Sequence, residues 1–330
     1  MIRKPFIAIT SGDPAGIGPE ICLKALRRRH VHDICIPFIV GNASVLRRVA
    51  LACGIPWRLP VISLNERSIL ELPSEPAVID PTSVQGISIS PGRICAEGGR
   101  TAYESFVWAA DMTMETAFDA VVTAPLNKKS LSLAGIRETG HTEILADMCG
   151  TEHCAMLYWS PSLCVSLATI HCALADVPRL LTKNRVYRTA RLMSNTLENI
   201  NRTKPCIALL GLNPHCGEKG LFGNEETDII IPAAEQLAEE GYTVRGPIPP
   251  DTAFIPENRK NYDGFVAMYH DQGSIPFKMV HFENGVNHTM GLPVIRTSVD
   301  HGTAFDIAWQ GKASCESLVS AIELAVKLSE

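Results

Sequence analysis

The chain has 330 residues and a mass of 35.9 kDa, a length that predicts about two domains at roughly 150 residues each. Hydrophobic residues make up 46% and charged residues 20%, which excludes a disordered chain because this composition can bury a large core. The formal net charge is −5 and aromatic residues are 6%, so neither a basic field nor a base-stacking surface predicts nucleic-acid binding.

Eleven cysteines are spread from Cys22 to Cys315, with no C-x-x-C pair. A chain of this length needs no disulfides to fold, so we interpret them as reduced, mostly buried thiols of a cytoplasmic protein. The N-terminal apolar run is too short for a signal peptide. The longest uncharged run, 153–175, could span a membrane by length, but Ser160-Pro161-Ser162 favours two short strands around a turn.

Short apolar runs alternate with helical patterns along the chain. Residues 56–95 predict irregular connections and short strands. The alternation elsewhere indicates an α/β architecture with a mostly parallel sheet. Strands are expected at 6–9, 34–40, 120–123, 163–170, 206–212, 243–244 and 264–269. Helices are expected at 20–29, after Ser44 as a candidate N-cap, at 102–118 and at 143–149.

Three of the apolar runs end at or shortly before a histidine, namely His171, His215 and His270. Ligands of open α/β sheets bind beyond the carboxyl ends of the strands. The three imidazoles could therefore converge on one divalent metal ion and leave room for a substrate oxygen. The alternative is three ordinary histidines at the edge of the core, because their separations in sequence match no compact zinc motif.

Hydroxyl and basic groups lie near the same predicted edge. Gly140-His141-Thr142-Glu143 opens a helical pattern, and its hydroxyl and N–H donors would suit an anion. Lys278, Asn287 and Arg296 follow His270, and Arg296 comes after an apolar run, which predicts that it sits at a strand end. Lys and Arg would hold an anionic substrate. The alternatives are a plain helix cap and solvated surface charge.

The glycine-containing loop at 11–20 links the first strand to the first helix, with Pro19 and Glu20 suited to a first helical turn. It matches neither G-x-G-x-x-G nor the Walker pattern. We interpret it as a tight strand-to-helix turn, so an enzyme of this sequence that used NAD would do so without the common nucleotide fold.

Five segments together resemble the signature of the 4-hydroxythreonine-4-phosphate dehydrogenase family, and the similarity runs from residue 6 to about 315. They are Gly12–Glu20, Gly140–Glu143, Leu212–Glu218, Tyr269–Gly273 and Arg296–Ala304. The resemblance implies NAD-dependent oxidation of a hydroxyl in a four-carbon 4-phosphate, followed by decarboxylation. It also implies a homodimer with the active site at the subunit interface.

The resemblance further implies a fold like that of isocitrate and isopropylmalate dehydrogenases, with two α/β/α domains and a cleft between them. The first domain would be discontinuous, combining 1–130 with 290–330, and would contact NAD. The second, 131–289, would carry the metal ligands and the dimer surface.

Residue by residue, the family's metal ligands fall on His171, His215 and His270. Its substrate contacts fall on His141, Thr142, Lys278, Asn287 and Arg296. The segment after Arg296 is similar to the adenosine-binding loop of isopropylmalate dehydrogenases, which assigns cofactor contacts to His301, Gly302, Thr303, Ala304 and Asp306. Asp251 and Asp271 are candidates for proton transfer or a further metal contact. Three histidines accept zinc, cobalt, manganese, nickel or magnesium.

The sequence departs from the biosynthetic pattern at Ser11, where the vitamin B6 enzymes usually carry Met, and at Glu143-Ile144-Leu145 and Trp309–Ser314. These segments look more like the family's catabolic branch. We therefore expect D-threonate 4-phosphate as the substrate, with dihydroxyacetone phosphate and CO₂ as products. The alternatives are 4-hydroxy-L-threonine 4-phosphate, D-erythronate 4-phosphate and, more distantly, an unphosphorylated cis-dihydrodiol or hydroxy acid. A non-catalytic metal and sugar-phosphate sensor is the remaining alternative.

Overall fold

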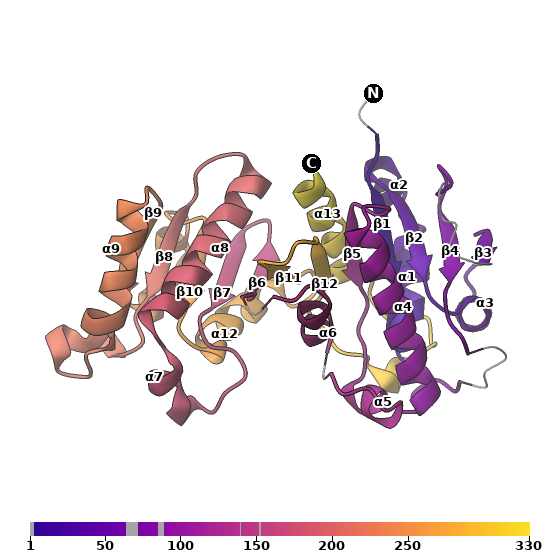
Figure 1. Cartoon of the computed structure of the whole chain (residues 1–330), viewed down its shortest axis with the longest axis horizontal. Helices are drawn as coiled ribbons and strands as arrows, with labels where there is room; N and C mark the ends of the chain where they lie inside the picture. Colours follow the sequence, from indigo (N-terminus) through magenta and orange to yellow (C-terminus); the bar gives the residue numbers. More distant parts are fainter. Residues whose placement is uncertain (1–2, 64–71, 85–88, 139, 152) are drawn as a thin grey trace. The chain divides into compact units, whose positions relative to one another are not determined.

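The computed structural model describes residues 3–63, 72–84, 89–138, 140–151 and 153–330. The chain divides into two compact units (Figure 1). Unit 1 combines Met1–Glu152 with Leu292–Glu330, and unit 2 is His153–Gly291. Unit 1 thus extends past residue 130, where the sequence analysis places the first boundary. The reason is packing, since Ile144 and Leu145 lie in the same buried cluster as Phe106 and Val121.

The described part of unit 1 contains six parallel strands in the order β3-β4-β2-β1-β5-β12. The strands are β1 (Phe6–Thr10), β2 (Ile36–Val40), β3 (Val61–Ser63), β4 (Ala77–Asp80), β5 (Ala120–Thr123) and β12 (Arg296–Val299). Its helices are α1 (Gly18–Ala25), α2 (Arg29–Ile34), α3 (Ala43–Ala52), α4 (Ala96–Met114), α5 (Lys128–Leu133), α6 (His141–Met148), η4 (Phe305–Ile307) and α13 (Glu316–Ser329).

The core of unit 1 forms because its central strands are buried on both faces. Ile7 and Ile9 of β1 alternate with Ala8, and all three are fully buried. Phe38 and Phe106, on β2 and α4, pack in one cluster with Ala8, while α13 lies against β5 and β12. Continuous apolar strands of this kind are typical of parallel sheets covered on both sides.

Unit 2 contains six strands in the order β11-β6-β7-β10-β8-β9. They are β6 (Ala155–Ser160), β7 (Leu163–Leu167), β8 (Cys206–Leu210), β9 (Thr243–Ile248), β10 (Gly264–Ala267) and β11 (Val286–Met290). Strand β6 pairs antiparallel with β7 and β11, and the other pairs are parallel. The helices are η1 (Leu174–Asp176), α7 (Val177–Leu180), α8 (Lys183–Asn201), η2 (Pro214–Gly220), η3 (Glu226–Ile230), α9 (Ile231–Glu239), α10 (Pro250–Ala253), α11 (Pro256–Arg259) and α12 (His270–His281).

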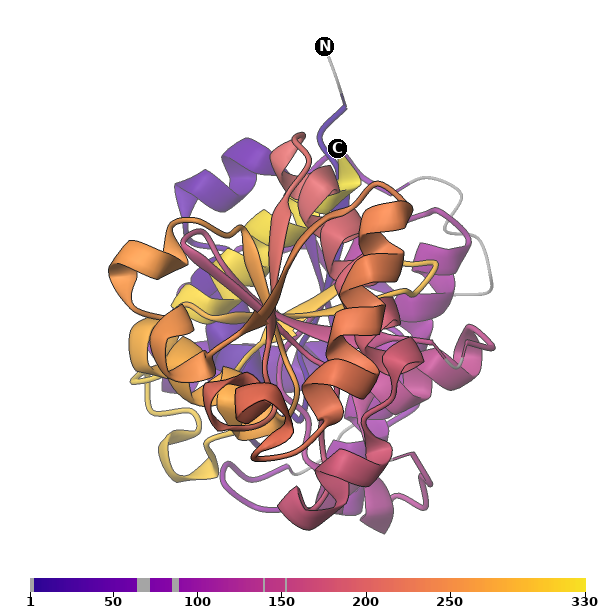
Figure 2. The same ribbon diagram turned by 90° about the vertical axis from the view of Figure 1, so that its left-hand side faces the viewer.

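Helices cover both sides of the strands in unit 2, with α12 on one side and α8 and α9 on the other (Figure 2). On the α12 side, Val165, Leu167 and Ala267 form a buried cluster with Phe277. A Cβ on Gly273 would lie 2.7 Å from Val165 and Leu167 side-chain atoms, so α12 packs closely because this residue has no side chain.

The α/β architecture expected from the alternating pattern is confirmed, as is the pair of short strands expected within 153–175, now β6 and β7. In the described part of the chain, no helix is both long and apolar enough to cross a membrane. Of the predicted irregular segment 56–95, residues 64–71 and 85–88 lie outside the described residues.

Two local expectations were wrong. Asn42, not Ser44, caps α3, because its side chain accepts a hydrogen bond from the backbone N–H of Val45, while the Ser44 hydroxyl donates to Asn42. Arg296 begins β12 instead of ending a strand. The apolar run before it contains Pro293, which lacks the N–H that a ladder needs.

All eleven cysteines lie within the described residues and are unpaired, which agrees with reduced thiols. The expectation that most are buried was wrong, since only Cys22, Cys35, Cys164 and Cys315 are and the other seven are partly exposed. Burial raises the pKa of the Cys35 and Cys164 thiols to about 12. These thiols stay protonated near neutral pH.

Asp13 is a fully buried carboxyl in the loop between β1 and α1. Its Oδ1 accepts a hydrogen bond from the N–H of Ala15 at 3.0 Å. Burial raises the pKa of Asp13, and the nearby Ser130 hydroxyl and the hydrogen bond from Ala15 only partly oppose this effect. The loop therefore holds an acid that is less ionised in the folded state than in the unfolded chain.

We expect Asp13→Asn to stabilise the fold at neutral and alkaline pH. The unfolded chain releases the Asp13 proton at lower pH than the folded state does, so stability falls as pH rises through that window. Asn removes this dependence, keeps an oxygen for Ala15 and can donate to Ser130, a gain of about 1 kcal/mol for one buried hydrogen bond. Urea unfolding at about pH 4 and about pH 8 measures both variants. A variant whose advantage does not grow with pH would contradict the assignment.

Candidate active site

The three predicted histidines follow three neighbouring parallel strands of unit 2. β10 pairs with β7 on one side and β8 on the other, so the segments after their carboxyl ends leave the same edge of the sheet. His171 follows β7, His215 follows β8 and His270 is the first residue of α12, directly after β10. The strands are shorter than the apolar runs suggest, but the edge on which the histidines lie is the expected one.

Hydrogen bonds beyond the strand ends tie these three segments together. The N–H of Thr169, after β7, donates to the carbonyl of Met268 at 3.2 Å, and its hydroxyl donates to the same oxygen at 2.7 Å. Gln272 accepts from the N–H of Met268 and donates to the carbonyl of Gly211, both at 2.7 Å. Gly211 follows β8, so one amide side chain bridges the ends of two strands.

His171 and His270 share a cavity of about 630 Å³. Their ring centroids are 5.7 Å apart. His270 donates from Nδ1 to Asp271 Oδ1 at 2.6 Å, which leaves Nε2 with its lone pair. A carboxylate that fixes the tautomer of a histidine in this way is typical of metal ligands.

His215 sits in a left-handed turn. The five residues His215–Lys219 all have φ between +44° and +77°, and for residues with a Cβ this conformation costs about 1–2 kcal/mol each. The buried carboxylate of Glu226 holds the start of this turn. Its Oε1 accepts from the N–H groups of Leu212 and Asn213 at 2.8 and 2.7 Å, and its Oε2 accepts from the Asn213 side chain at 3.0 Å.

Among the described residues, no group of three or more His, Cys, Asp or Glu side chains has the geometry of a complete metal site. The donor chemistry nevertheless fits. Two imidazoles bound to one tetrahedral ion at Zn–N distances of ~2.1 Å have centroids about 5 Å apart, close to the separation of His171 and His270. The structure brings these two rings together and leaves His215 outside their immediate group.

Tyr158 connects His270 with two of the predicted substrate contacts. Its hydroxyl lies 3.5 Å from His270 Nε2, and Lys278 Nζ lies 5.9 Å from the centre of its ring. Asn287 on β11 is directly opposite Tyr158 on β6, so the two side chains project from the same face. The ring of Phe277 stacks on Tyr158 at 5.3 Å. Lys278 and Asn287 therefore belong to one group with His270.

The other predicted substrate contacts lie in unit 1. His141 and Thr142 are the first two residues of α6, and Gly140 is the N-cap, so the helix expected at 143–149 begins two residues earlier than predicted. The His141 ring packs edge-on against Phe106 at 4.6 Å. Arg296 is buried and donates to Thr123 Oγ1 at 2.8 Å, which aims it along the end of β5.

Charge and burial set the protonation of this group. Burial lowers the pKa of the His141 imidazole well below its usual range, and the neighbouring Arg296 lowers it further. Burial also lowers the pKa of Arg296 to about 10, an effect that Glu143 opposes. Near neutral pH the group thus carries a neutral imidazole, whose Nε2 is buried, and a charged guanidinium. A neutral donor beside a buried cation is suited to an anionic ligand.

The predicted cofactor segment follows β12 and packs on the glycine-containing loop. The N–H of Ile17 donates to the carbonyl of Thr303 at 3.0 Å. A Cβ on Gly16 would lie 2.7 Å from that same oxygen, so glycine there permits the approach of the two loops. Ala304 adopts a left-handed conformation with φ of 39°, and Gly302 and Asp306 are exposed.

The two predicted aspartates differ in their surroundings. Asp271 lies against His270. Asp251 lies at the start of α10 and is exposed. The pKa of the nearby Cys216 thiol is raised to about 11 by burial, by Glu226 and by Asp251. Asp251 therefore lies near the turn that carries His215.

Sequence reasoning missed Tyr158, Gln272, Glu226 and Thr123. Gln272 stands within the Tyr269–Gly273 segment and could have been found there. Thr123 could also have been found, because it ends a predicted strand and such positions often carry site residues. Nothing in the sequence singles out Tyr158 or Glu226. Tyr158 meets Asn287 only because β6 pairs with β11, and Glu226 matters only because the folded chain brings it back to Asn213.

Comparison with known proteins shows what the chain as a whole is similar to. The family described as pyridoxal phosphate biosynthetic protein PdxA matches residues 33–325. A 4-hydroxythreonine-4-phosphate dehydrogenase from Desulfosudis oleivorans is 43% identical, covering 99% of this chain and 96% of that protein. The D-threonate 4-phosphate dehydrogenase of Salmonella typhimurium is 41% identical over 98% of each chain.

A crystal structure of a 4-hydroxythreonine-4-phosphate dehydrogenase from Klebsiella pneumoniae superposes with a TM-score of 0.86 at 41% identity. It covers 99% of this chain and 98% of that chain. The identity is high over nearly full length, and the relatives are dehydrogenases acting on CH–OH groups. On this evidence the chain belongs to the PdxA family of dehydrogenases.

Proposed function

We propose that this chain catalyses the NAD-dependent oxidation and decarboxylation of D-threonate 4-phosphate. The main support for this proposal is that His171, His215 and His270 follow three neighbouring parallel strands. The chain's membership in the PdxA family adds to it. In this reaction the C3 hydroxyl would lose its proton and the C3 carbon would lose a hydride to NAD, which leaves a ketone β to the carboxylate. The C1–C2 bond then breaks, CO₂ leaves, and C2 takes up a proton to give dihydroxyacetone phosphate.

When bound, NAD would accept the hydride and a divalent cation would stabilise negative charge on the substrate oxygens. His171, His215 and His270 would hold the cation. His270 suits this role because Asp271 occupies Nδ1 and leaves Nε2 as the donor atom. The loop with His301, Gly302, Thr303, Ala304 and Asp306 would contact NAD.

The chain's own cationic groups would bind and orient the substrate. Arg296, fixed by Thr123, would bind an anionic end of the molecule with two parallel hydrogen bonds. His141 and Thr142 offer donors at the N-terminus of α6, where the helix dipole favours negative charge. Lys278 and Asn287, which lie beside Tyr158, would also bind the substrate. Asp251 and Asp271 are our candidates for moving the protons.

The choice of substrate rests on the sequence features typical of the catabolic branch. One of them, Ser11, lies at the carboxyl end of β1 and is buried. Gly41 lies so close that a Cβ built on it would be 2.1 Å from the Ser11 hydroxyl. A side chain larger than serine at position 11 would therefore have little room. The second candidate substrate, 4-hydroxy-L-threonine 4-phosphate, is favoured by the 43% identity to a relative named for it.

A homodimer is part of the proposal. In α12 and at its end, Ile275, Met279, Val280 and Phe282 are 55%, 82%, 52% and 72% exposed. Four neighbouring apolar side chains in water are unusual on a monomer and typical of an interface. The same helix begins with His270 and carries Lys278, so a second copy packed on α12 would adjoin the site.

The metal role predicts the behaviour of His215→Ala. Loss of one imidazole ligand should abolish turnover and most binding of Zn²⁺ or Co²⁺, while the circular dichroism spectrum stays that of the folded chain. Metal content by mass spectrometry and NADH absorbance measure the two effects. Unchanged activity after rigorous chelation of the parent protein would contradict the role of the metal.

Variants of Glu226 should weaken metal binding partly instead of abolishing it, since this carboxylate holds the start of the turn that positions His215. Glu226→Ala should weaken metal affinity by about 10- to 100-fold, the usual effect of removing a group that orients a ligand. Glu226→Gln keeps an acceptor oxygen and should recover most of the affinity. Asp228→Ala removes an exposed carboxylate of the same helix, η3, and is the control. Equal metal affinity in all three variants would show that Glu226 does not position His215.

The dimer predicts that Met279→Glu combined with Phe282→Glu yields a folded monomer with little turnover, because two charges would be buried in the interface. Light scattering after gel filtration measures the mass. Leu51→Glu changes an equally exposed apolar residue, 84% accessible on α3, and should leave the dimer intact. A double variant that remains dimeric would place the interface elsewhere.

The substrate is identified by comparing kcat/KM for D-threonate 4-phosphate, D-erythronate 4-phosphate and 4-hydroxy-L-threonine 4-phosphate in an NADH assay. We expect the first to be best, with equimolar dihydroxyacetone phosphate and CO₂. Removing the phosphate should cost about 100-fold, since two or more charge-assisted hydrogen bonds are lost. A preference for another phosphate would overturn the substrate assignment. Equal activity on unphosphorylated threonate would favour the hydroxy-acid alternative, and ligand binding without NADH formation would favour a sensor.

A further inference from the structure

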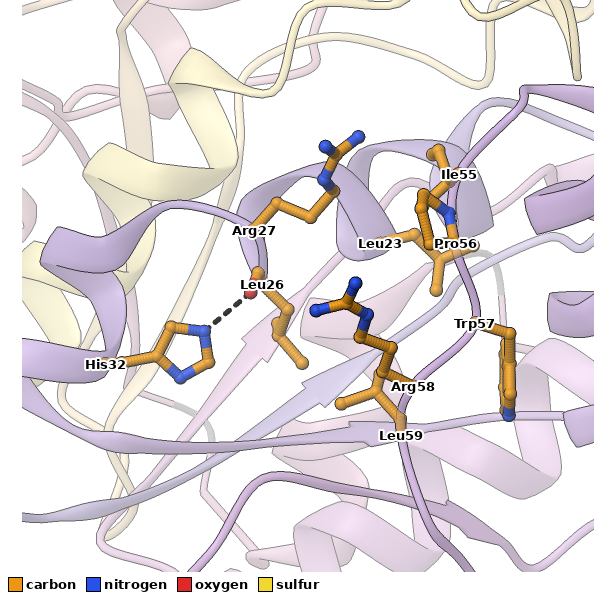
Figure 3. Close-up of a pocket in the computed structure, with 9 residues that line it drawn as sticks. All are labelled: Leu23, Leu26, Arg27, His32, Ile55, Pro56, Trp57, Arg58 and Leu59. Atoms are coloured by element: carbon orange, nitrogen blue, oxygen red, sulfur yellow. Dashed lines mark hydrogen bonds between the residues drawn. The ribbon is translucent and has the colours of Figure 1, made fainter.

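A second hollow lies in unit 1, at the opposite edge of its sheet from Thr123. It has a volume of about 370 Å³, within the usual range for small-molecule sites of about 300–1,000 Å³. It is lined by Leu23, Leu26, Arg27, His32, Ile55, Pro56, Trp57, Arg58 and Leu59 (Figure 3). None of these residues belongs to the groups described above.

The position of this hollow follows from the direction of α1. This helix begins at Gly18, after the loop at the carboxyl end of β1, and its eight residues carry the chain back by roughly 12 Å. Leu23, Leu26 and Arg27 lie at its far end. His32 is in α2, just before the start of β2, where Ile36 pairs with the first residue of β1. The hollow is therefore at the amino edge of the sheet, whereas Thr123 lies at the carboxyl edge.

Two arginines give the hollow its charge. Figure 3 shows the guanidinium groups of Arg27 and Arg58 over the same space, with His32 on one side and Pro56 and Trp57 on the other. Among the described residues, neither guanidinium has a hydrogen bond or an ion pair. Other cations of unit 1 differ, since Arg3 pairs with Asp119 and Lys24 with Glu20.

The lining of the hollow carries an excess of positive charge. No Asp or Glu is among the described residues that line it. Arg47 adds a third cation, because its guanidinium lies 5.4 Å from the centre of the Trp57 ring. The chain as a whole has a net charge of −5, so this cationic hollow is a local feature. Two like charges over one space repel unless an anion lies between them.

The remaining lining atoms are apolar. Leu23, Leu26 and Ile55 are each less than 9% exposed and form a fixed wall. His32 is held in place because its Nε2 lies 2.6 Å from the carbonyl oxygen of Leu26 and donates to it. Pro56 and Trp57 complete the wall with rigid rings. A ligand that satisfied every lining group would need an anionic end for the guanidinium groups and a compact apolar body for the wall.

We propose that this hollow is a binding site for a small phosphate monoester with an apolar or aromatic body. The phosphate would lie between Arg27 and Arg58, each of which can donate two parallel hydrogen bonds. The organic body would lie against Leu26, Ile55 and Trp57. Because the site is at the amino edge of the unit 1 sheet, its ligand would not occupy the position beside Thr123 at the carboxyl edge.

The test uses phenyl phosphate as the probe on the full chain labelled with fluorotryptophan. The ¹⁹F resonance of Trp57, assigned by its loss in Trp57→Phe, reports this hollow and not the substrate groups. We expect a saturable shift with phenyl phosphate. Inorganic phosphate and phenol, which each supply half of the recognised chemistry, should need about tenfold or higher concentrations.

Variants of the exposed arginines test the geometry. Arg27→Gln and Arg58→Gln should each weaken phenyl phosphate binding by about tenfold or more, the usual effect of losing a charged hydrogen bond. Arg29→Gln makes the same charge change on the same segment, outside the hollow, and should bind within about twofold of the parent. All three side chains are exposed, and equal melting temperatures confirm that the variants fold.

Several results would overturn the proposal. They are no saturable shift of the Trp57 resonance, equal affinity for the three probes, or equal weakening by Arg29→Gln, which would indicate only a diffuse attraction for anions. The proposed dehydrogenase activity is measured separately with NADH. Its failure leaves the Trp57 signal unaffected, so the two proposals fail independently.

Discussion

The alignment of β7, β10 and β8 as parallel neighbours is the constraint on which the candidate site depends. Parallel strands leave the sheet at the same edge, so residues far apart in sequence arrive together. The pairing does not stop at the strand ends. Thr169 and Gln272 bond to Met268, and Gln272 also bonds to Gly211. The segments that carry His171, His215 and His270 thus start from fixed backbone positions.

Buried polar side chains then orient the groups that would meet a ligand. Tyr158 lies between His270 and Lys278, Glu226 holds the start of the turn with His215, and Thr123 fixes Arg296. A carboxylate such as Glu226 is costly to bury, and its three accepted hydrogen bonds offset that cost. These contacts are made before any ligand binds, so less side-chain freedom remains to be lost on binding.

Charge in this molecule is arranged locally and does not follow the net value. The sum of −5 excludes a broad basic surface, yet unit 1 carries cationic groups at both edges of its sheet. At the carboxyl edge Arg296 is buried and bonded to Thr123. At the amino edge Arg27 and Arg58 are exposed over an apolar wall. Burial and a partner thus distinguish the group in the proposed substrate site from the groups in the proposed second site.

The sequence by itself determined the α/β class, the presence of a helix near residue 143 and the edge on which three histidines would lie, because periodicity and strand-end position are local properties. The tertiary structure alone decided which strands are neighbours, and hence that Asn287 lies opposite Tyr158. It also decided that Arg296 begins a strand, that Glu226 returns to Asn213, and that His215 stands in a left-handed turn. These features depend on contacts between residues distant in sequence, and no local pattern encodes such contacts.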